Sequence, residues 1–362
     1  MTPVSTQEDS LRRAFSLILL GAGVFAIAVA VILPTYVYSS LAKVPLDQNS
    51  TTVLEGSAAK ALVVSDRGAG PVAEIRENVN LTATAKVQPN FARAEMKEGS
   101  DVAVWLLATE VTDNADDAIV TASKRQVCFD RRTAEGYVPR PGTIEPKCQP
   151  SSSFTTKIDT KPPANPGDLP REVVTETGQP GLNFKFPFGV EKKDYDVYND
   201  SVKKAGTAKY SGTEKLDDVE VYKFVEQIPD TQISRQTVPG TLVGTDQPSV
   251  EAGRFYQATI TTWAEPVTGV IVKQQQQQHQ ELRVDGGVSG TVVFDGTLTY
   301  NQATVDRNIA QVQANRGKLS FIATTGPIVF GVTGGLMLVA GAFLLLRRSR
   351  TDDRPVARHT PS

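Results

Sequence analysis

The stretch from Thr259 to Gln280, TITTWAEPVTGVIVKQQQQQHQ, holds residue types that active sites use, among them Glu265 and His279. A carboxylate and an imidazole that lie close together can act as general acid and base. The chain has 2 histidines, and the other, His359, stands in an arginine-rich tail near the C-terminus. No Ser-His or Cys-His pair is therefore expected, and the usual zinc sites are excluded for the same reason.

The same stretch also has the composition of a turn between two strands. Pro266 fixes φ and Gly269 tolerates the left-handed region, while apolar runs flank both residues. Glu265 precedes a proline and is therefore expected to be extended. We predict that Trp263, Glu265, Pro266, Thr268 and Gly269 form a structural turn rather than a catalytic site.

Carboxylates are the remaining candidates for catalysis, because a glycosidase needs only two of them. Asp194, Asp196 and Asp200 lie in KKDYDVYND, which mixes charges as a solvated face does. The chain has no G-x-x-x-x-G-K-[ST] loop and no G-x-G-x-x-G after a strand. Its net charge of −2 leaves no footprint for nucleic acid. We expect no enzymatic activity, no cofactor, no metal and no nucleic-acid partner.

Two charge-free apolar segments flank the region that holds these candidate residues and would anchor it. The first runs from Phe15 to Leu33 and the second from Gly326 to Leu346. At about 1.5 Å per residue such a helix reaches about 28 Å, close to the hydrocarbon thickness of a bilayer. The sequence therefore predicts transmembrane helices over residues 14–37 and 321–346 rather than buried core helices.

Arginines flank both predicted helices on the same side. Arg12 and Arg13 precede the first, and Arg347, Arg348, Arg350 and Arg354 follow the second. Clustered arginine beside a span stays in the cytoplasm. Residues 1–13 and the basic tail 347–362 are therefore expected inside, in a plasma membrane, and residues 38–320 outside.

The first apolar segment permits two other interpretations. SLAK, from Ser40 to Lys43, offers a signal-peptidase site after Ala42, although the apolar run is longer than that of a signal peptide. RRAFS shares its arginine pair with twin-arginine signals but lacks their flanking consensus. We expect an uncleaved anchor.

The region between the spans alternates with period two, which is typical of strands with one covered and one wet face. Four stretches show it best: VAVWLLATEV, VEVYKFVEQI, RFYQATITTW and GTVVFDGTLTY. After residue 300, Val305, Ile309 and Val312 fall on one face of a helix that leads into the second span. We predict an α+β fold that is mainly β, with a large antiparallel domain.

Two segments break this pattern. Residues 137–181 contain nine prolines, and because proline blocks regular structure we expect an excursion or linker outside the core. The QQQQQHQ run is polar and predicts either a disordered loop or, since GVIV precedes it and ELRV follows, a long edge strand.

The 2 cysteines, Cys128 and Cys148, both lie in the exported region. An even count in an oxidising compartment predicts a disulfide, with two free buried thiols as the alternative. In the spans, small residues at four-residue spacing predict close helix packing or dimerisation, unless they are simply common in spans: Ala22, Ala26, Ala30, Gly331 and Gly335.

Several stretches together resemble the actinobacterial two-span family labelled porin PorA. They are KVPLD after the first span, CFDRRTA, GLNFKFPFGVEKKDYDVYND, YSGTEKLDDVEVYKF and TTWAEPVTGVIV. The likeness covers most of residues 15–346, and FPF…YDVYND and WAEPVTG are its most specific parts. It implies an exported protein of the bacterial envelope, while the label itself implies a pore.

AEPVTGVIV is also similar to the EPxTG turn of class B scavenger receptors, which share the layout of two terminal spans around one large ectodomain. That resemblance implies a barrel-like β-rich domain enclosing an apolar tunnel for lipid. This ectodomain is shorter, and its single cysteine pair does not reproduce their several disulfides.

Three functions follow from these patterns. The first is an envelope protein whose domain binds or transports lipid or glycolipid through an apolar cavity, with membrane lipid or lipoglycan as its partner. The second is a porin-like channel component, which would require oligomerisation through the spans because two helices enclose no water. The third is a scaffold that binds envelope-assembly proteins.

Overall fold

The computed structural model describes residues 5–66, 71–138, 148–149, 151, 153–158, 172–176, 178–285 and 290–349. It divides into two compact units. Lys43–Ala314 form the first, called the β-domain below, and Met1–Ala42 with Asn315–Ser362 form the second, called the span unit.

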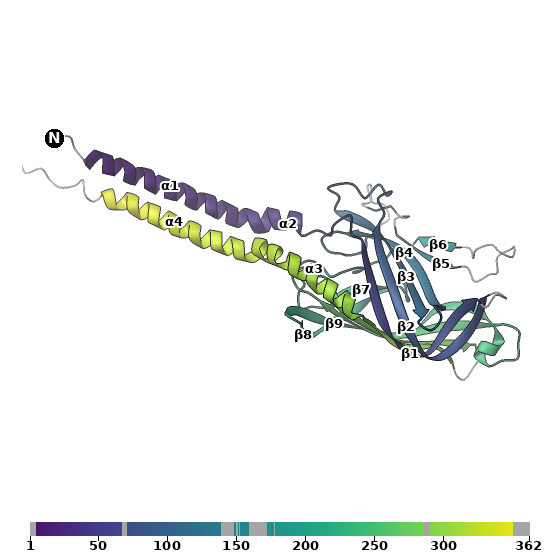
Figure 1. Cartoon of the computed structure of the whole chain (residues 1–362). Coiled ribbons are helices and arrows are strands. Elements are labelled where there is room, and N and C mark those ends of the chain that lie inside the picture. Colours follow the sequence, from purple (N-terminus) through teal and green to yellow (C-terminus); the bar gives the residue numbers. More distant parts are fainter. Residues whose placement is uncertain are drawn as a thin grey trace, which may run out of the picture. The chain divides into compact units, whose positions relative to one another are not determined.

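The span unit is built from two helical stretches that lie side by side (Figure 1). The first consists of α1 (Ser5–Ile32), the π-helix η1 (Leu33–Val37) and α2 (Tyr38–Leu41). The second is α3 (Gln302–Ser320), which begins in the β-domain, followed by the π-helix η4 (Phe321–Thr325) and α4 (Gly326–Ser349). Pro34 lies in η1 and Pro327 is the second residue of α4, and a proline removes one N–H from the helical ladder.

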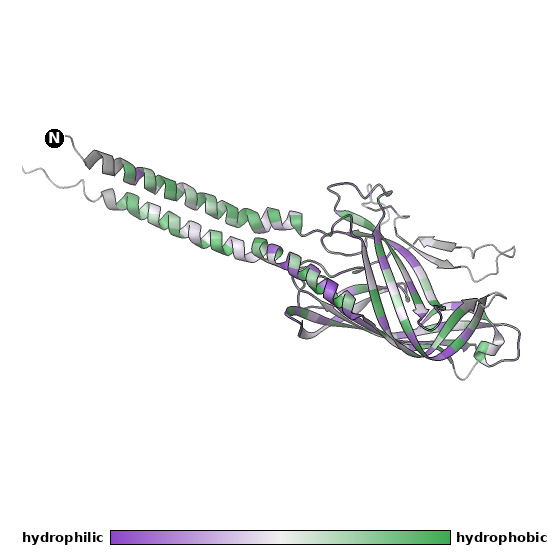
Figure 2. Cartoon of the chain, in the orientation of Figure 1, coloured by the Kyte–Doolittle hydropathy of each residue, from purple (hydrophilic) through white to green (hydrophobic). Residues whose placement is uncertain are grey.

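Both stretches are long and apolar enough to cross a membrane (Figure 2). Their large apolar side chains are exposed, with Phe25 and Val339 each 70% accessible. A core helix of a soluble domain would bury such side chains. The two helices therefore fit a membrane-anchored protein.

Twelve strands of the described residues form one sheet in the β-domain. They are β1 (Ser50–Asp66), β2 (Pro71–Pro89), β3 (Val102–Asp113), β4 (Ile119–Asp130), β5 (Phe154–Ile158), β6 (Glu172–Glu176), β7 (Tyr195–Asn199), β8 (Lys204–Leu216), β9 (Val219–Val238), β10 (Val250–Ala264), β11 (Ile271–Val284) and β12 (Thr291–Tyr300). A short 3-10 helix, η3 (Gly240–Val243), follows β9. The four stretches with the clearest alternation are β3, β9, β10 and β12, as the sequence predicts.

The sheet is an antiparallel meander in two halves. Its order is β6-β5-β4-β3-β2-β1-β12-β11-β10-β9-β8-β7, so that the first and last strands of the meander meet at β1 and β12. Single bridges join Glu135 to Leu182 and Leu182 to Val197, which links the chain after β4 to β7. Arg125 of β4 also lies 5.6 Å from the Tyr198 ring of β7. These contacts roll the sheet, which confirms the barrel-like, mainly β fold.

The glutamine run lies in the middle of this sheet. β11 pairs with β10 along one side and with β12 along the other. Gln276 faces Ile260 and Leu298 across the two neighbours, and Leu298 belongs to a buried cluster with Leu81. The even-numbered glutamines of β11 thus lie on the covered face of the sheet, and the odd-numbered ones on the exposed face. The expectation of an edge strand is wrong.

Both faces of β9 are covered, which explains its mixed pattern. Val219 and Val221 are fully buried in a cluster with α3, whose inward residues are Val305, Ile309 and Val312, as predicted. On the opposite face Phe224 is buried in another cluster with Phe186.

The proline-rich excursion is only partly described. Within residues 137–181, β5 and β6 pair with each other, and β5 pairs with β4, so the segment adds a hairpin to the end of the sheet. Those ten residues are therefore strands within the segment predicted to be an excursion or linker.

Candidate functional site

The β10–β11 turn is held together by a buried carboxylate. Glu265 is 2% exposed, and one oxygen accepts hydrogen bonds from the backbone N–H (2.7 Å) and the hydroxyl (2.6 Å) of Thr268. The other oxygen accepts from the N–H of Val267 at 3.1 Å. These bonds occupy the carboxylate, so that its role in the molecule is to fix the turn.

The β10–β11 turn also holds residues 186–190 in place through backbone hydrogen bonds. The carbonyls of Gly269, Val267 and Pro266 accept hydrogen bonds from the N–H groups of Phe186 (2.9 Å), Gly189 (3.1 Å) and Val190 (2.7 Å). Gly269 has φ +70°, and a Cβ there would lie 2.2 Å from the Phe186 carbonyl oxygen. Only glycine fits this close approach.

The clamped segment forms one wall of a hollow of about 490 Å³, called the acidic hollow below. Its lining combines carboxylates, aromatic rings and few cations. It consists of Thr133, Glu135, Leu182, Pro187, Phe188, Gly189, Glu191, Lys193, Asp194, Tyr195, Asp196 and Thr207.

Three polar side chains of the acidic hollow, those of Tyr195, Asp194 and Asp196, are held by hydrogen bonds to the backbone or to a neighbour. The Tyr195 hydroxyl accepts from the Glu191 N–H at 2.9 Å. Asp194 accepts from the Tyr210 N–H at 3.0 Å, and Asp196 accepts from the Thr207 hydroxyl at 3.1 Å. These three side chains are thus held in place without a ligand, which lowers the entropy cost of binding one.

Aromatic packing supports the wall from behind. Phe186 is 2% exposed, stacks on Phe224 with ring centroids 4.5 Å apart, and meets Tyr195 edge-on at 5.3 Å. The Lys185 ammonium lies 3.3 Å from the centroid of the Phe188 ring. Burial lowers the pKa of Lys185 to about 7, and the nearby charge of Glu265 opposes that shift.

The acidic hollow carries excess negative charge. Lys193 pairs with Glu191 at 2.7 Å, and this bond raises the pKa of Lys193. Glu135, Asp194 and Asp196 form no ion pair with any described residue. Carboxylates accept hydrogen bonds from hydroxyl groups, and ring faces pack against apolar surface. The described residues contain no group of three acids, histidines or cysteines placed to hold a metal ion.

A second hollow, of about 350 Å³, lies at the other half of the sheet and is called the cationic hollow. It is lined by Asn90, Arg93, Leu106, Lys124, Gln126, Ser151 and Phe154. Both linings mix polar with apolar side chains, with Leu182 and Phe188 in the first and Leu106 and Phe154 in the second, so neither is the continuous Phe, Val, Leu and Ile cavity of the lipid-tunnel prediction.

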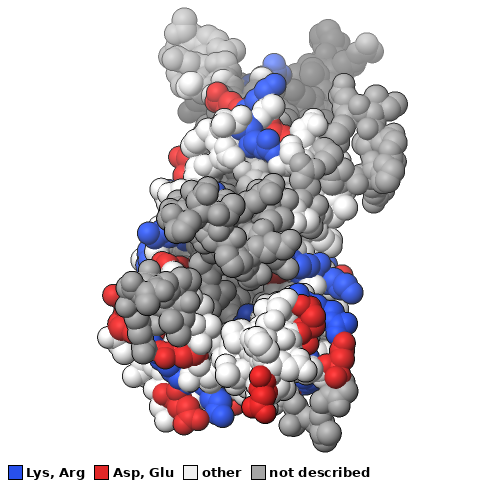
Figure 3. Space-filling model, turned by 90° about the vertical axis from the view of Figure 1, so that its right-hand side faces the viewer, with Lys and Arg blue, Asp and Glu red and all other residues white. Residues whose placement is uncertain are grey.

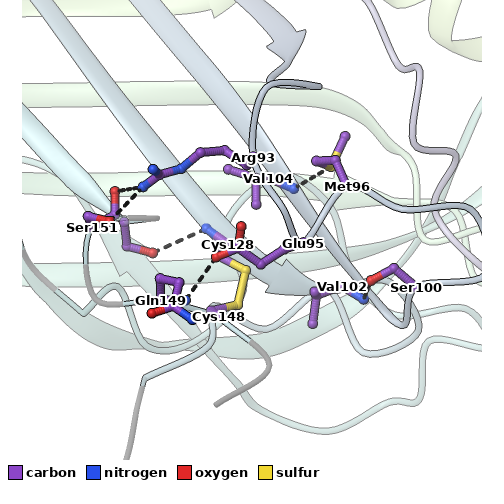
Figure 4. The surroundings of a disulfide bond; sticks show 11 residues. Arg93, Glu95, Met96, Ser100, Val102, Val104, Cys128, Cys148, Gln149 and Ser151 are labelled. Atoms are coloured by element: carbon purple, nitrogen blue, oxygen red, sulfur yellow. Dashed lines mark hydrogen bonds between the residues drawn. A yellow bond between two sulfur atoms is a disulfide. The ribbon is translucent and has the colours of Figure 1, made fainter. Parts of the chain in front are cut away.

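The predicted disulfide between Cys128 and Cys148 is present beside this second hollow (Figure 4). It ties the chain near residue 148 to β4. Ser153 accepts from the Cys128 N–H at 3.1 Å, and Arg93 donates to the carbonyl and, at 3.0 Å, to the hydroxyl of Ser151. The bridge and these bonds fix the wall of the hollow that Ser151 provides.

A buried carboxylate elsewhere in the sheet escaped sequence analysis. Glu226 on β9 is 4% exposed, and its Oε1 has no hydrogen-bond partner among the described residues. Burial raises its pKa to about 7. Gly206 leaves room for it, since a Cβ there would lie 2.3 Å from that oxygen.

The predicted span-packing residues divide into two groups. Ala26 is buried against Gly334, and the Ala30 Cβ lies 3.9 Å from a Cβ built on Gly331. Ala22 is exposed, and a Cβ built on Gly335 would meet no atom of another segment within 4 Å. Closest contact occurs at a pair that the spacing did not select, Gly23 and Gly334.

The acids considered in the sequence lie in different places. Asp194 and Asp196 line the acidic hollow with Tyr195, whereas Asp200 pairs with Lys203 at 2.6 Å outside it. The Asp-Tyr-Asp alternation was a usable signal of that site. No sequence pattern marked Arg93 and Lys124. On the face of the molecule drawn in Figure 3, basic and acidic side chains of the described residues are intermixed.

Comparison with known proteins gives one consistent result. A family model described as Porin PorA matches residues 15–343. A protein named Porin PorA from Corynebacterium resistens is 23% identical over 410 aligned positions, covering 93% of this chain and 97% of the relative. Another Porin PorA, from Corynebacterium amycolatum, is 24% identical over 390 positions, covering 90% and 96%.

Proposed function

The chain belongs to the porin PorA family, and we propose that it is a membrane-anchored envelope protein. Its β-domain is proposed to bind a glycolipid or lipoglycan by the sugar head. The protein is proposed to be non-catalytic. Its arginine clusters at residues 12–13 and 347–354 favour cytoplasmic termini and an exported β-domain.

The acidic hollow is the observation that carries this proposal. Glu135, Asp194 and Asp196 have no ion pair among the described residues, and such carboxylates accept hydrogen bonds from sugar hydroxyl groups. The aromatic residues Phe188 and Tyr195 line the same hollow, and aromatic rings pack against apolar surface. A volume of about 490 Å³ has room for a sugar unit or two. The ligand would be held by its head rather than by its chains, because the lining includes four carboxylates.

Native mass spectrometry of the full chain in mild detergent tests this function. We expect glycolipid to co-purify with the wild type and to fall about tenfold in Asp194→Asn with Asp196→Asn, which keep their acceptor oxygens but lose charge. Asp217→Asn, in the exposed β8–β9 turn, is the matched control. Equal lipid in all three proteins would refute the proposal.

The names of the relatives favour a pore as a second candidate. A barrel in lipid needs an apolar outer face, but the exposed positions of the central strands include Gln275, Gln277 and Asp295. A pore would therefore require several copies assembled through the spans. Purified protein in a planar bilayer should give no conductance steps, and steps of uniform size would favour the pore instead.

A further inference from the structure

The cationic hollow gathers basic and amide groups without an acid in its described lining. Register places Lys124 and Gln126 on one face of β4, with Leu106 and Phe154 directly opposite Gln126 on β3 and β5. Arg93 reaches this face from the β2–β3 loop.

Arg93 has N–H donors for which no described residue supplies an acceptor. One terminal nitrogen, Nη2, donates to Ser151, whereas the buried Nε has no partner among the described residues. A guanidinium has five N–H donors in a planar fork, and an unmet buried donor costs stability until an acceptor arrives.

Lys124 adds a second positive charge. Its side chain is exposed on β4 and forms no ion pair with a described residue. Arginine recognises phosphate oxygens through its fork, and lysine does so as a point charge.

We propose that the cationic hollow binds a phosphate group, either free or carried by a lipid. Arg93 and Lys124 neutralise it, and the Asn90 and Gln126 amides line the polar side of the site. Leu106 and Phe154 supply an apolar side that suits the organic part of a phosphoester. The site shares no lining residue with the acidic hollow, so the inference stands independently of the proposed function.

Calorimetry on the full chain in a neutral detergent tests the proposal with two probes, inorganic phosphate and water-soluble dihexanoyl phosphatidic acid. We expect binding of at least one probe, weakened about tenfold by Arg93→Gln and by Lys124→Gln. Lys209→Gln on β8 is a matched exposed control that should bind as the wild type does.

The two probes separate the sources of the phosphate. Binding of both assigns a general phosphate site, and binding of the lipid alone assigns a lipid phosphate. Arg93→Gln also removes the hydrogen bonds to Ser151 and could disturb folding. If Arg93→Gln misfolds, Lys124→Gln, at an exposed position, is the decisive variant. Failure of both probes, or undiminished binding in Lys124→Gln, would overturn the inference, whereas Asp194→Asn with Asp196→Asn should leave phosphate binding intact.

Discussion

The two hollows of the β-domain differ in charge and in the way their walls are held. The acidic hollow depends on hydrogen bonds from the 265–269 turn to residues 186–190, organised by one buried carboxylate. The cationic hollow depends on a covalent bridge between Cys128 and Cys148. One wall is therefore sensitive to a single side chain, and the other to the redox state of the compartment.

The largest effect is expected from Glu265→Ala. The substitution strands two N–H groups and one hydroxyl in a buried turn, which should lower the free energy of unfolding by about 4 kcal/mol. Denaturant unfolding of the full chain, followed by tryptophan fluorescence, measures this loss. Sugar-head binding should disappear while phosphate binding persists.

Glu220→Ala, at an exposed position on β9, is the control and should change stability by under about 0.5 kcal/mol. If Glu265→Ala were equally harmless, the clamp would not hold the acidic hollow, and the contrast between the two walls would be lost.

Removal of the disulfide should have the next largest effect. The bridge closes a loop with a sequence separation of 20, and its loss should cost about 3 kcal/mol through the entropy of the unfolded chain. Cys128→Ser with Cys148→Ser should weaken phosphate binding and leave sugar-head binding unchanged. Wild-type protein treated with a reductant should behave in the same way. Loss of both activities together would show that the hollows are not independent.

Glu226 is expected to make the stability of the fold depend on pH, and it lies in the half of the sheet that supports the acidic hollow. It lies two residues after Phe224, which stacks on Phe186 in the supporting wall. Folding raises its pKa from 4.5 to about 7, so the fold favours the protonated acid. Its stabilising contribution is complete below the unfolded pKa and is lost as pH rises through about 7.

Glu226→Gln should therefore be more stable than the wild type at pH 8, by about 2 kcal/mol, and similar to it at pH 4. Thermal unfolding across that range measures the difference, and the exposed Glu220→Gln is the control. A constant difference between wild type and Glu226→Gln at every pH would contradict a buried, titrating carboxylate.

Local pattern predicted much of this fold. Alternation located β3, β9, β10 and β12, apolar length located the spans, and compartment chemistry paired Cys128 with Cys148. Each of these inferences needs only neighbours in sequence or the residue type itself.

What failed depended on partners far away in sequence. The glutamine run is central because β1 pairs with β12, which seals the side of the sheet where an edge was expected. The acidic hollow exists because Leu182 bridges Glu135 and Val197. No local period encodes either event, so the sequence predicts neither hollow as a whole, and the Asp-Tyr-Asp alternation marks only one strip of the acidic lining.

The smallest effect on both hollows is expected from the spans. A Cβ at Gly334 would lie 2.8 Å from the Gly23 carbonyl oxygen, whereas Gly335 faces open space. Gly334→Leu should therefore separate α1 from α4, and Gly335→Leu should not. A cysteine pair at Ala30 and Gly331, with Cβ atoms 3.9 Å apart, reports the contact through oxidative cross-linking in membranes. Cross-linking should fall in Gly334→Leu alone, with sugar-head and phosphate binding unchanged in both variants. A change in either binding activity would mean that the packing of α1 against α4 in the bilayer affects the geometry of a hollow. The walls of the two hollows would then depend on the spans as well as on the turn and the disulfide.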